Sequence, residues 1–408
     1  MRRELLLVFI LAGVQFSHII DFVIMMPLGP QLMRMFGIAP REFALVVSVY
    51  TLSASLSCFG ASFFMDRFDR KKTLLLVYAG LVVGTFVCGL APNFPSLVAA
   101  RSITGMFGGL LQPIILAIIG DLIPESRRGQ ATGIVMAAFA VSSVVGVPIG
   151  LSLANSFGWQ TAFITLAVFS AMNLALAWRR LPPVTSHITK RVPSSGMIHD
   201  MVAILKLPNS WVALVLITTM MSIFTFTPFV SPFLVQIVGI AEADLPTVYM
   251  FGGAASFVVS PLIGRIADRF GARRVFISSS VVAVPAMLIF SNLQKTSLAV
   301  AVAMNTLVAA VGAARMTPSL ALINGSVSSA LRGRFMTLIA SVQQLAAACA
   351  SFIGGLILGD SSSGLARFPL LGSIVATSMV ISSLLSLLIR TEQKTVKRGG
   401  TETKPGRD

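Results

Sequence analysis

The sequence predicts an all-α membrane protein in which twelve transmembrane helices form two pseudo-symmetric six-helix bundles. Three observations predict this fold class: a shortage of charged residues, twelve apolar runs of helical length, and motifs that recur halfway along the chain. Of the 408 residues, 55% are hydrophobic and 11% are charged, whereas about 25% are charged in a typical soluble protein. A soluble enzyme, a coiled coil and a disordered chain are therefore excluded, because lipid must surround most of the molecule.

Each apolar run is long enough to cross a bilayer, since about 20 helical residues span a hydrocarbon layer of about 30 Å. Strand-like alternation is absent over these lengths, which argues against a β-barrel. The first run reaches Pro27, contains Asp21 and lacks a small-residue cleavage site, so we expect a retained helix and not a signal peptide. The runs begin near Leu5, Phe43, Thr73, Ser96, Ala131, Gln160, Trp211, Pro246, Val275, Thr296, Phe335 and Pro369.

The net charge of +16 is best explained by membrane topology. In a soluble chain such a surplus would suggest nucleic-acid binding, but here the basic residues lie in short loops between apolar runs, and no nucleic-acid partner is expected. Most of them fall on the side of the N-terminus, so the positive-inside rule places both termini in the cytoplasm. The exceptions are Arg34, Arg41, Lys295 and Arg367 on the opposite side, and Arg101 and Arg315 inside runs.

Loop motifs recur at a nearly constant offset, which indicates a duplicated six-helix unit. Asp66-Arg67-Phe68 follows the second run and Asp268-Arg269-Phe270 follows the eighth. We therefore expect an N-terminal six-helix bundle over 1–180, a cytoplasmic linker with a membrane-surface helix over 181–209, a C-terminal bundle over 210–390 and a disordered cytoplasmic tail over 391–408. The linker's apolar residues Ile198, Met201, Val202 and Leu205 suit a helix lying on the membrane surface.

Three motifs make the chain resemble a family. The second-half loop has a Gly-x-x-x-Asp-Arg-x-Gly pattern at Gly264 to Gly271, followed by basic residues; the fourth run contains Arg101-Ser102-Ile103-Thr104-Gly105; and the fifth contains Gly146-Val147-Pro148-Ile149-Gly150. With these motifs the chain resembles a major facilitator superfamily transporter, in particular the twelve-span drug:proton antiporter branch of bacteria. This resemblance implies a multi-pass protein of the bacterial cytoplasmic (inner) membrane. In that branch the motif with Gly146, Pro148 and Gly150 is associated with exporters, although a simple packing kink is the structural alternative.

The resemblance also implies a cytoplasmic latch. In family terms Asp66, Arg70 and Asp121 would form a charge relay that holds the cytoplasmic side shut. The counterpart of Asp121 in the second half lies near Gly325 and is not acidic, so the latch is expected to be one-sided. The alternative is that these charges only set topology. The full set of latch candidates is Asp66, Arg67, Arg70, Asp121, Asp268, Arg269 and Arg273.

Asp21 is the acidic residue that lies well inside an apolar run. His18 and Gln15, at three-residue intervals before it, share its helix face. Burial favours the neutral acid and a nearby arginine favours the carboxylate, so we predict that Asp21 is the proton-coupling group, tuned by His18 or Arg101. The alternative is a permanent structural ion pair.

The remaining polar residues in the runs are weaker candidates for a substrate cavity. Arg315 would either bind an anionic or zwitterionic substrate or pair with Asp21, and the sequence leaves both open. The cavity candidates are Gln15, Gln112, Asn305, Arg315, Gln343, Gln344 and Phe226. Interhelical hydrogen bonding is an equally good explanation for the amides.

The sequence therefore predicts a secondary active transporter that exports a small organic molecule in exchange for protons by alternating access. No metal-ligand spacing or phosphate-binding loop is visible, so we expect no cofactor, no metal and no enzyme activity, only the proton gradient as driving force. The partners would be a small-molecule substrate, protons and the lipid bilayer, with a monomer as the expected state. The alternatives are an importer or facilitator of a sugar or other metabolite, and a receptor or scaffold that does not transport.

Overall fold

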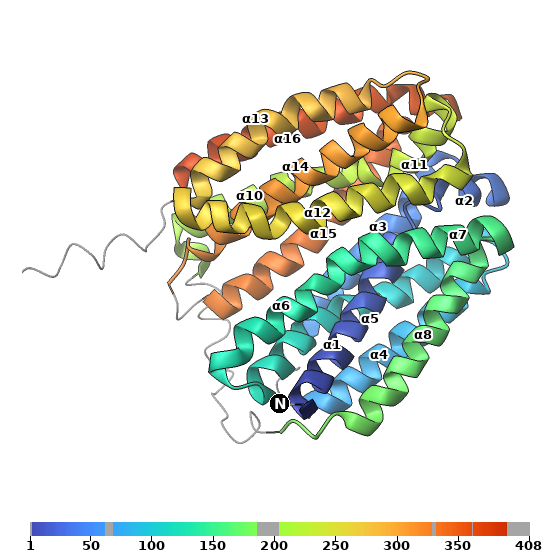
Figure 1. Ribbon diagram of the computed structural model, residues 1–408. Coiled ribbons are helices and arrows are strands. Elements are labelled where there is room, and N and C mark those ends of the chain that lie inside the picture. Colours follow the sequence, from blue (N-terminus) through green and yellow to red (C-terminus); the bar gives the residue numbers. More distant parts are fainter. Residues whose placement is uncertain (1, 62–67, 186–203, 329–331, 361, 390–408) are drawn as a thin grey trace, which may run out of the picture.

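Two helical bundles lie side by side in the molecule (Figure 1). The structure, a computed structural model, describes residues 2–61, 68–185, 204–328, 332–360 and 362–389. Within these ranges 12 helices are long and apolar enough to cross a membrane, and no strand is present. The all-α membrane fold with twelve spanning helices is thus confirmed.

The first bundle is built from the N-terminal half of the chain. Its fifth span is bent by a π-helical turn at Ser142–Gly146, directly before Pro148. A short helix, α2, joins the first and second spans. The helices are α1 (Arg2–Val23), α2 (Gly29–Phe36), α3 (Pro40–Ala61), α4 (Arg70–Gly89), α5 (Phe94–Leu122), α6 (Glu125–Val141), α7 (Val147–Phe157) and α8 (Trp159–Arg180).

The second bundle is built from the C-terminal half. Its first span is interrupted by 3₁₀ turns at Met221–Thr225 and Thr227–Phe229, next to Pro228. Residues 186–203 and 390–408 lie outside the described residues, and with them most of the expected surface helix and the tail. The helices are α10 (Pro208–Met220), α11 (Val230–Phe233), α12 (Leu245–Phe270), α13 (Ala272–Ser291), α14 (Leu298–Asn324), α15 (Arg332–Leu358) and α16 (Phe368–Leu388).

The starts of two helices follow from local sequence signals. The side chain of Asn93 accepts a hydrogen bond from the Ser96 backbone N–H, and the Ser96 hydroxyl accepts one from the Asn93 backbone N–H, so a capping box begins α5. The carboxylate of Asp69 accepts the Lys71 backbone N–H at the start of α4. These caps fix where the spans carrying the polar core begin.

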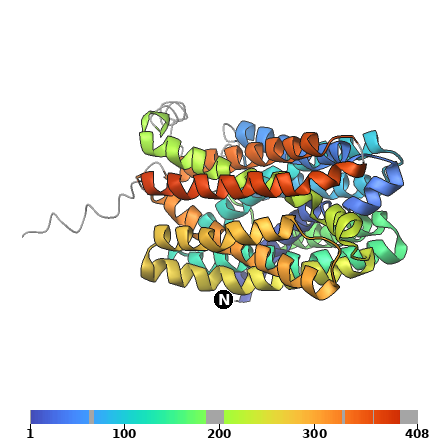
Figure 2. The same cartoon turned by 90° about the horizontal axis from the view of Figure 1, so that it is seen from above.

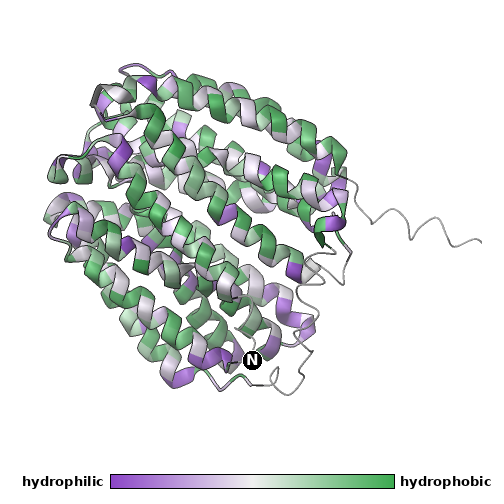
Figure 3. Ribbon diagram, turned by 180° about the vertical axis from the view of Figure 1, so that it is seen from behind, coloured by the Kyte–Doolittle hydropathy of each residue, from purple (hydrophilic) through white to green (hydrophobic). Residues whose placement is uncertain are grey.

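The helix ends gather at two faces of the molecule. We call the face that contains the start of α1 and the end of α8 the terminal face, and the face that contains α2 and α11 the far face (Figure 1). Hydrophobic residues cover the middle of the helices and hydrophilic ones collect near the ends (Figure 3). This is the distribution that a bilayer requires.

The two bundles contact each other through α3 with α15 and through α12 with α6 and α7. A Cβ atom at Gly253 of α12 would lie 2.7 Å from the backbone carbon of Ser143, so the helices touch closely there. The Ser55 hydroxyl of α3 donates to the Ser341 carbonyl of α15 at 2.9 Å. Viewed from above, the helices of both bundles run along a common direction (Figure 2), and in Figure 1 the bundles converge toward the far face and diverge toward the terminal face.

Candidate functional site

A polar core lies inside the first bundle along one face of α1. Gln15, His18 and Asp21 are 4%, 9% and 0% exposed. They occupy the same side of the helix because three residues make nearly one turn. The structure therefore places the three α1 residues singled out by the sequence together in the protein interior.

Asp21 forms an ion pair with Arg101 of α5. One guanidinium nitrogen of Arg101, Nη1, donates to Oδ2 of Asp21 at 3.0 Å and to its backbone carbonyl, also at 3.0 Å. The Thr85 hydroxyl of α4 donates to Oδ1 at 2.8 Å. Both charged side chains are 0% exposed, and a buried pair of this kind is held together mainly because either charge alone would be costly in a low-dielectric interior.

Tyr50 of α3 completes the core and was not anticipated from the sequence. The carbon Cζ of Arg101 lies 4.3 Å from the centre of the Tyr50 ring, a cation–π contact. The Tyr50 hydroxyl is 3.3 Å from Nδ1 of His18. Tyrosine is common in apolar runs, so the sequence does not distinguish Tyr50. Its contacts with residues of other helices identify it as part of the core.

Glycines in α5 let Tyr50 approach. A Cβ atom at Gly105 would lie 2.3 Å from the Tyr50 carbonyl oxygen, and one at Gly108 would lie 2.3 Å from its hydroxyl oxygen. Small residues allow such close helix contacts in membranes. Gly105 is the glycine of the fourth-span motif, so that motif serves to bring α3 and Arg101 together.

Three buried polar atoms in this core have no hydrogen-bond partner among the residues that the structure describes. They are Nε and Nη2 of Arg101 and Oε1 of Gln15. Buried polar groups are satisfied in most proteins, and ordered water supplies the missing partner where the side chains do not. These atoms mark positions where water belongs.

The fifth-span motif packs directly against α1. A Cβ atom at Gly146 would lie 2.2 Å from Cδ1 of Ile20, and one at Gly150 would lie 2.8 Å from Cδ1 of Ile24. The motif therefore contacts the helix segment on either side of Asp21. Pro148 follows the π turn and accompanies the bend in the span.

Arg315 lies in the second bundle and is 4% exposed. Its Nε donates to the Ser280 hydroxyl of α13 at 3.0 Å, and its Nη2 donates to the Ser382 hydroxyl of α16 at 2.6 Å. Its Cζ lies 5.2 Å from the Phe276 ring centre. Arg315 thus ties α14 to two helices of its own bundle, whereas Asp21 is paired with Arg101 in the other.

The other cavity candidates do not converge on one point. The Asn305 amide donates to the Val248 carbonyl at 3.1 Å and joins α14 to α12. Gln112 is exposed, and Gln343 and Gln344 are half-buried. Phe226 is 1% exposed and packs 4.4 Å, centroid to centroid, from Phe368, so it belongs to an aromatic cluster of the second bundle.

The described latch candidates make contacts within a single bundle. Arg70 of α4 pairs with Asp121 of α5 at 2.8 Å. In the second bundle Arg273 donates to the Ile389 carbonyl, and the guanidinium of Arg269 lies over the ring of its neighbour Phe270. The side chain of Asp268 is exposed. Asp66 and Arg67 lie outside the described residues, so the proposed relay through Asp66 stays a prediction.

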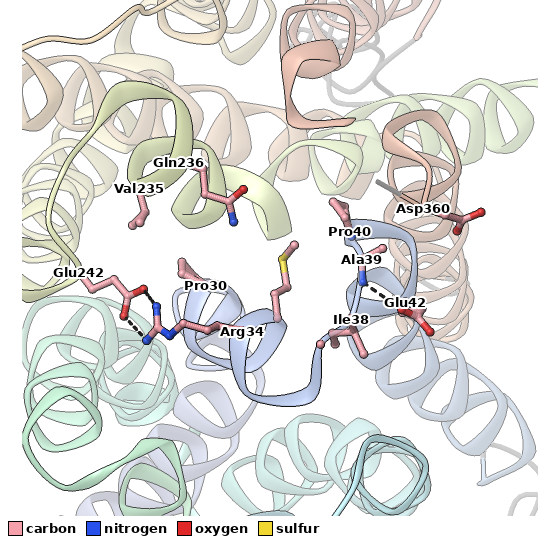
Figure 4. Close-up of a pocket in the computed structure, with 12 residues that line it drawn as sticks. Pro30, Arg34, Ile38, Ala39, Pro40, Glu42, Val235, Gln236, Glu242 and Asp360 are labelled. Atoms are coloured by element: carbon pink, nitrogen blue, oxygen red, sulfur yellow. Dashed lines mark hydrogen bonds and ion pairs between the residues drawn. The ribbon is translucent and has the colours of Figure 1, made fainter. Parts of the chain in front are cut away.

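The far face is closed by polar contacts between the bundles, which the sequence did not reveal. Arg34 of α2 forms a two-pronged ion pair with Glu242 (Figure 4), and the Asn155 amide donates to the Glu242 carbonyl at 3.1 Å. Arg41 of α3 pairs with Asp360 at 3.1 Å. The hydrogen bonds and charge of Glu242 raise the pKa of Arg34 above its ordinary value. We call these residues the far-face seal.

A pocket of about 470 Å³ lies at this seal (Figure 4). Its walls come from α2 and the start of α3 in one bundle and from the segment around Val235 and Gln236 in the other. The Glu42 carboxylate is oriented there by the Ala39 backbone N–H, which donates to it at 2.9 Å. The pocket is thus on the far face, well away from Asp21 in the polar core.

No group of three or more histidine, cysteine or acidic side chains suited to a metal occurs in the part of the chain that the structure describes.

Two bundles of spanning helices, with a buried ion pair inside the first bundle, form an architecture that many secondary transporters share. The family model described as Major Facilitator Superfamily matches residues 11–260 and 212–407. The chain belongs to the major facilitator superfamily.

Relatives and solved structures agree with this assignment. A probable sugar efflux transporter from Mannheimia succiniciproducens is 23% identical over 54% of this chain and 55% of its own length. Multidrug resistance protein 3 from Bacillus subtilis is 30% identical over 40% of this chain and 32% of its own. The chain spans about half the length of the curated relatives it matches.

A crystal structure of a D-xylose–proton symporter superposes with a TM-score of 0.78 over 96% of this chain and 98% of that chain. The two are 16% identical in sequence. At this identity the likeness concerns the fold alone.

Proposed function

We propose that this protein is a secondary active transporter that exports a small organic molecule by proton antiport, with alternating access between the two bundles. The Asp21–Arg101 ion pair is the observation that carries the proposal. A carboxylate that is 0% exposed inside a membrane bundle is costly to keep, and intramembrane acids of this kind commonly mark proton pathways.

The chemistry follows from the geometry of the pair. When Asp21 is ionised, its charge and that of Arg101 offset each other at 3.0 Å. Protonation of Asp21 leaves Arg101 as an uncompensated buried cation, which raises the free energy of this arrangement and favours one that admits water or a counter-charge. The ionisation state of Asp21 can therefore bias the equilibrium between two arrangements of the bundles.

Two observations support export as the direction. Gly146 and Gly150 of the exporter-associated motif pack against α1 on both sides of Asp21. The relatives include proteins named as a sugar efflux transporter and a multidrug resistance protein. By analogy with these names, a sugar-like or drug-like organic molecule is the proposed class of substrate.

The test uses the full chain reconstituted in proteoliposomes with an imposed pH gradient and a panel of labelled sugars and hydrophobic dyes. We expect uphill movement of at least one compound opposite to the proton gradient, and a loss of that coupling in Asp21→Asn. Thr218→Val is the matched control, because the Thr218 hydroxyl donates to the Leu214 carbonyl of its own helix at 2.9 Å. Unchanged coupling in Asp21→Asn would reject the proposal.

The same assay separates the alternatives. The fold is shared with a D-xylose–proton symporter, so an importer remains the second candidate, and it predicts uptake in the direction of the proton gradient. A receptor or scaffold predicts no gradient-driven flux of any compound. Fusion of a reporter to each terminus tests the proposed cytoplasmic orientation in the inner membrane, and sedimentation in detergent tests the proposed monomer.

A further inference from the structure

We propose that Tyr50, His18 and Gln15 form a proton relay, completed by buried water, that leads from Asp21 along α1 in the direction of the terminal face. The inference rests on the proposed role of Asp21 and adds the route by which its proton leaves. It assigns a function to Tyr50 and to the three unpartnered polar atoms of the core.

The relay residues lie in one continuous series. The guanidinium of Arg101 contacts Asp21 on one side and the Tyr50 ring, at 4.3 Å, on the other. The Tyr50 hydroxyl lies 3.3 Å from Nδ1 of His18. Gln15 follows one turn further along α1 in the direction of the terminal face, because α1 starts at that face.

Unpartnered atoms occur at both ends of this series. Nε and Nη2 of Arg101 lie at the Asp21 end and Oε1 of Gln15 lies at the other. Each of these buried atoms needs a hydrogen-bond partner that no described side chain supplies. One or two waters at each end would satisfy them and would close the distance between Asp21 and the Tyr50 hydroxyl, and between His18 and Gln15.

Proton transfer along the series balances at each step. Protonated Asp21 gives its proton to the water near Arg101, and that water gives a proton to the Tyr50 oxygen as the Tyr50 hydroxyl passes its own proton to Nδ1 of His18. His18 then releases the proton on Nε2 to water held by Gln15, and exchange of the remaining proton from Nδ1 to Nε2 through water restores the starting tautomer. Because Asp21 becomes ionised in the first step, the transient imidazolium faces a neutral Asp21–Arg101 pair and not a lone cation.

The surroundings of His18 contain no second carboxylate among the described residues. The charged and titratable groups next to this part of α1 are Asp21 on α1, Tyr50 on α3, Tyr78 and Cys88 on α4 and Arg101 on α5, and Tyr78 bonds Ser17 and not His18. The spans that pack on the other sides of α1 contribute neutral groups: the Ser142 hydroxyl donates to the Phe16 carbonyl, and the Asn173 amide donates to the Ile10 carbonyl. The relay is thus the titratable connection that leads from Asp21.

The direction of the relay fits the arrangement of the bundles. The far-face seal joins the bundles through Arg34–Glu242 and Arg41–Asp360. A proton released in this conformation therefore has its exit toward the terminal face, which is the direction in which the relay runs from Asp21 to the buried Gln15.

The experiment follows the carboxyl infrared band of Asp21 in the purified, lipid-reconstituted protein after a rapid pH jump, which requires no transported compound. The band is assigned by its absence in Asp21→Asn. In Tyr50→Phe, which keeps the ring and removes the hydroxyl, we expect the band to respond about 100-fold more slowly, the lower range for loss of a positioned proton-transfer group. His18→Leu and Gln15→Leu should slow it as well, with the final band amplitude retained.

Tyr78→Phe is the matched control. Tyr78 is also fully buried next to α1, but its hydroxyl bonds Ser17 at 2.9 Å on another side of that helix. It should respond at the wild-type rate. Equal rates in Tyr50→Phe and the wild type would overturn the relay while leaving the role of Asp21 intact. Absence of any band that Asp21→Asn removes would instead overturn the proposed function, and the relay with it.

Discussion

Nη1 of Arg101 donates to both the side chain and the backbone carbonyl of Asp21, each at 3.0 Å. This double contact holds α5 against α1 at the level where Thr85 of α4 also bonds the carboxylate. Three helices of the first bundle therefore meet at one buried ion pair. The consequences for stability and for conformational change can be tested separately.

The first prediction concerns removal of one partner of this pair. Arg101→Ala leaves the Asp21 charge uncompensated, and breaking a buried pair in this way costs about 3–5 kcal/mol. We expect a large loss of thermal stability in detergent at neutral pH. The double variant Asp21→Asn/Arg101→Leu removes both charges and should recover most of the loss. Equal damage in the single and double variants would contradict this account.

The second prediction concerns the close approach of Tyr50 to α5. A Cβ atom at Gly105 would be 2.3 Å from the Tyr50 carbonyl oxygen, so Gly105→Ala must push α3 away and should cost about 1–3 kcal/mol, as overpacking does. Gly120→Ala on the same helix meets nothing within 4 Å. That control should be neutral or gain up to about 1 kcal/mol of helix stability. Thermal unfolding of both variants provides the comparison.

The third prediction concerns the far-face seal. The side chain of Glu242 is 20% exposed and that of its partner Arg34 is 68% exposed, so the pair contributes about 1 kcal/mol or less. Glu242→Gln should shift the population toward separation of the far face by up to about five-fold, given that 1.4 kcal/mol corresponds to ten-fold. Electron spin resonance distances between labels on α2 and α12 would measure this shift.

The pair at the seal is exposed, and its contribution should also fall as salt is added. Raising the ionic strength should therefore reproduce part of the effect of Glu242→Gln in the wild type. In the variant itself the label distances should respond much less to salt. A salt response of the same size in both would show that other charges close this face.

The fourth prediction concerns Arg315, which bonds hydroxyl groups of Ser280 and Ser382 at 3.0 and 2.6 Å. Ser280→Ala removes an acceptor and leaves a buried guanidinium N–H unsatisfied, at a cost of about 1–3 kcal/mol. Arg315→Met removes the cation itself, so its effect on stability should be smaller than that of Ser280→Ala. If Arg315→Met is the more damaging change, a counter-charge for this residue exists that the hydroxyl contacts do not explain. Unfolding measurements on the two variants decide the order.

Much of the polar core could be predicted from the sequence because its signals are local. Gln15, His18 and Asp21 share a helix face through their three-residue spacing, and burial in an apolar run made Asp21 conspicuous. Arg101 was also identified from the sequence, because it is a charged residue inside an apolar run. The partner of Asp21 could not be chosen between His18 and Arg101, since that choice depends on how α1 and α5 pack.

The role of Tyr50 could not be predicted from the amino-acid sequence. Nothing in its own segment separates it from any other aromatic residue of a spanning helix, and its role comes from the glycines of α5 and from Arg101 across the bundle. The far-face seal is a similar case, because Arg34 and Glu242 lie in different halves of the chain and in different connections. Arg315 bonds residues of α13 and α16, and its position in the apolar run did not indicate these partners.

Composition, run length and the repeated loop motifs were by themselves enough to predict a twelve-span helical membrane protein, and its motifs were enough to show a resemblance to the major facilitator superfamily. They suffice because the lipid bilayer requires each span to be apolar and long enough to cross it. Both properties are visible in the sequence of each span by itself. The pairing of the buried charges, the hydrogen bonding of the buried polar atoms and the end of the molecule at which the bundles converge were decided only by tertiary structure. Those properties depend on the packing of helices from distant parts of the sequence, where an ångström of approach decides whether two groups bond.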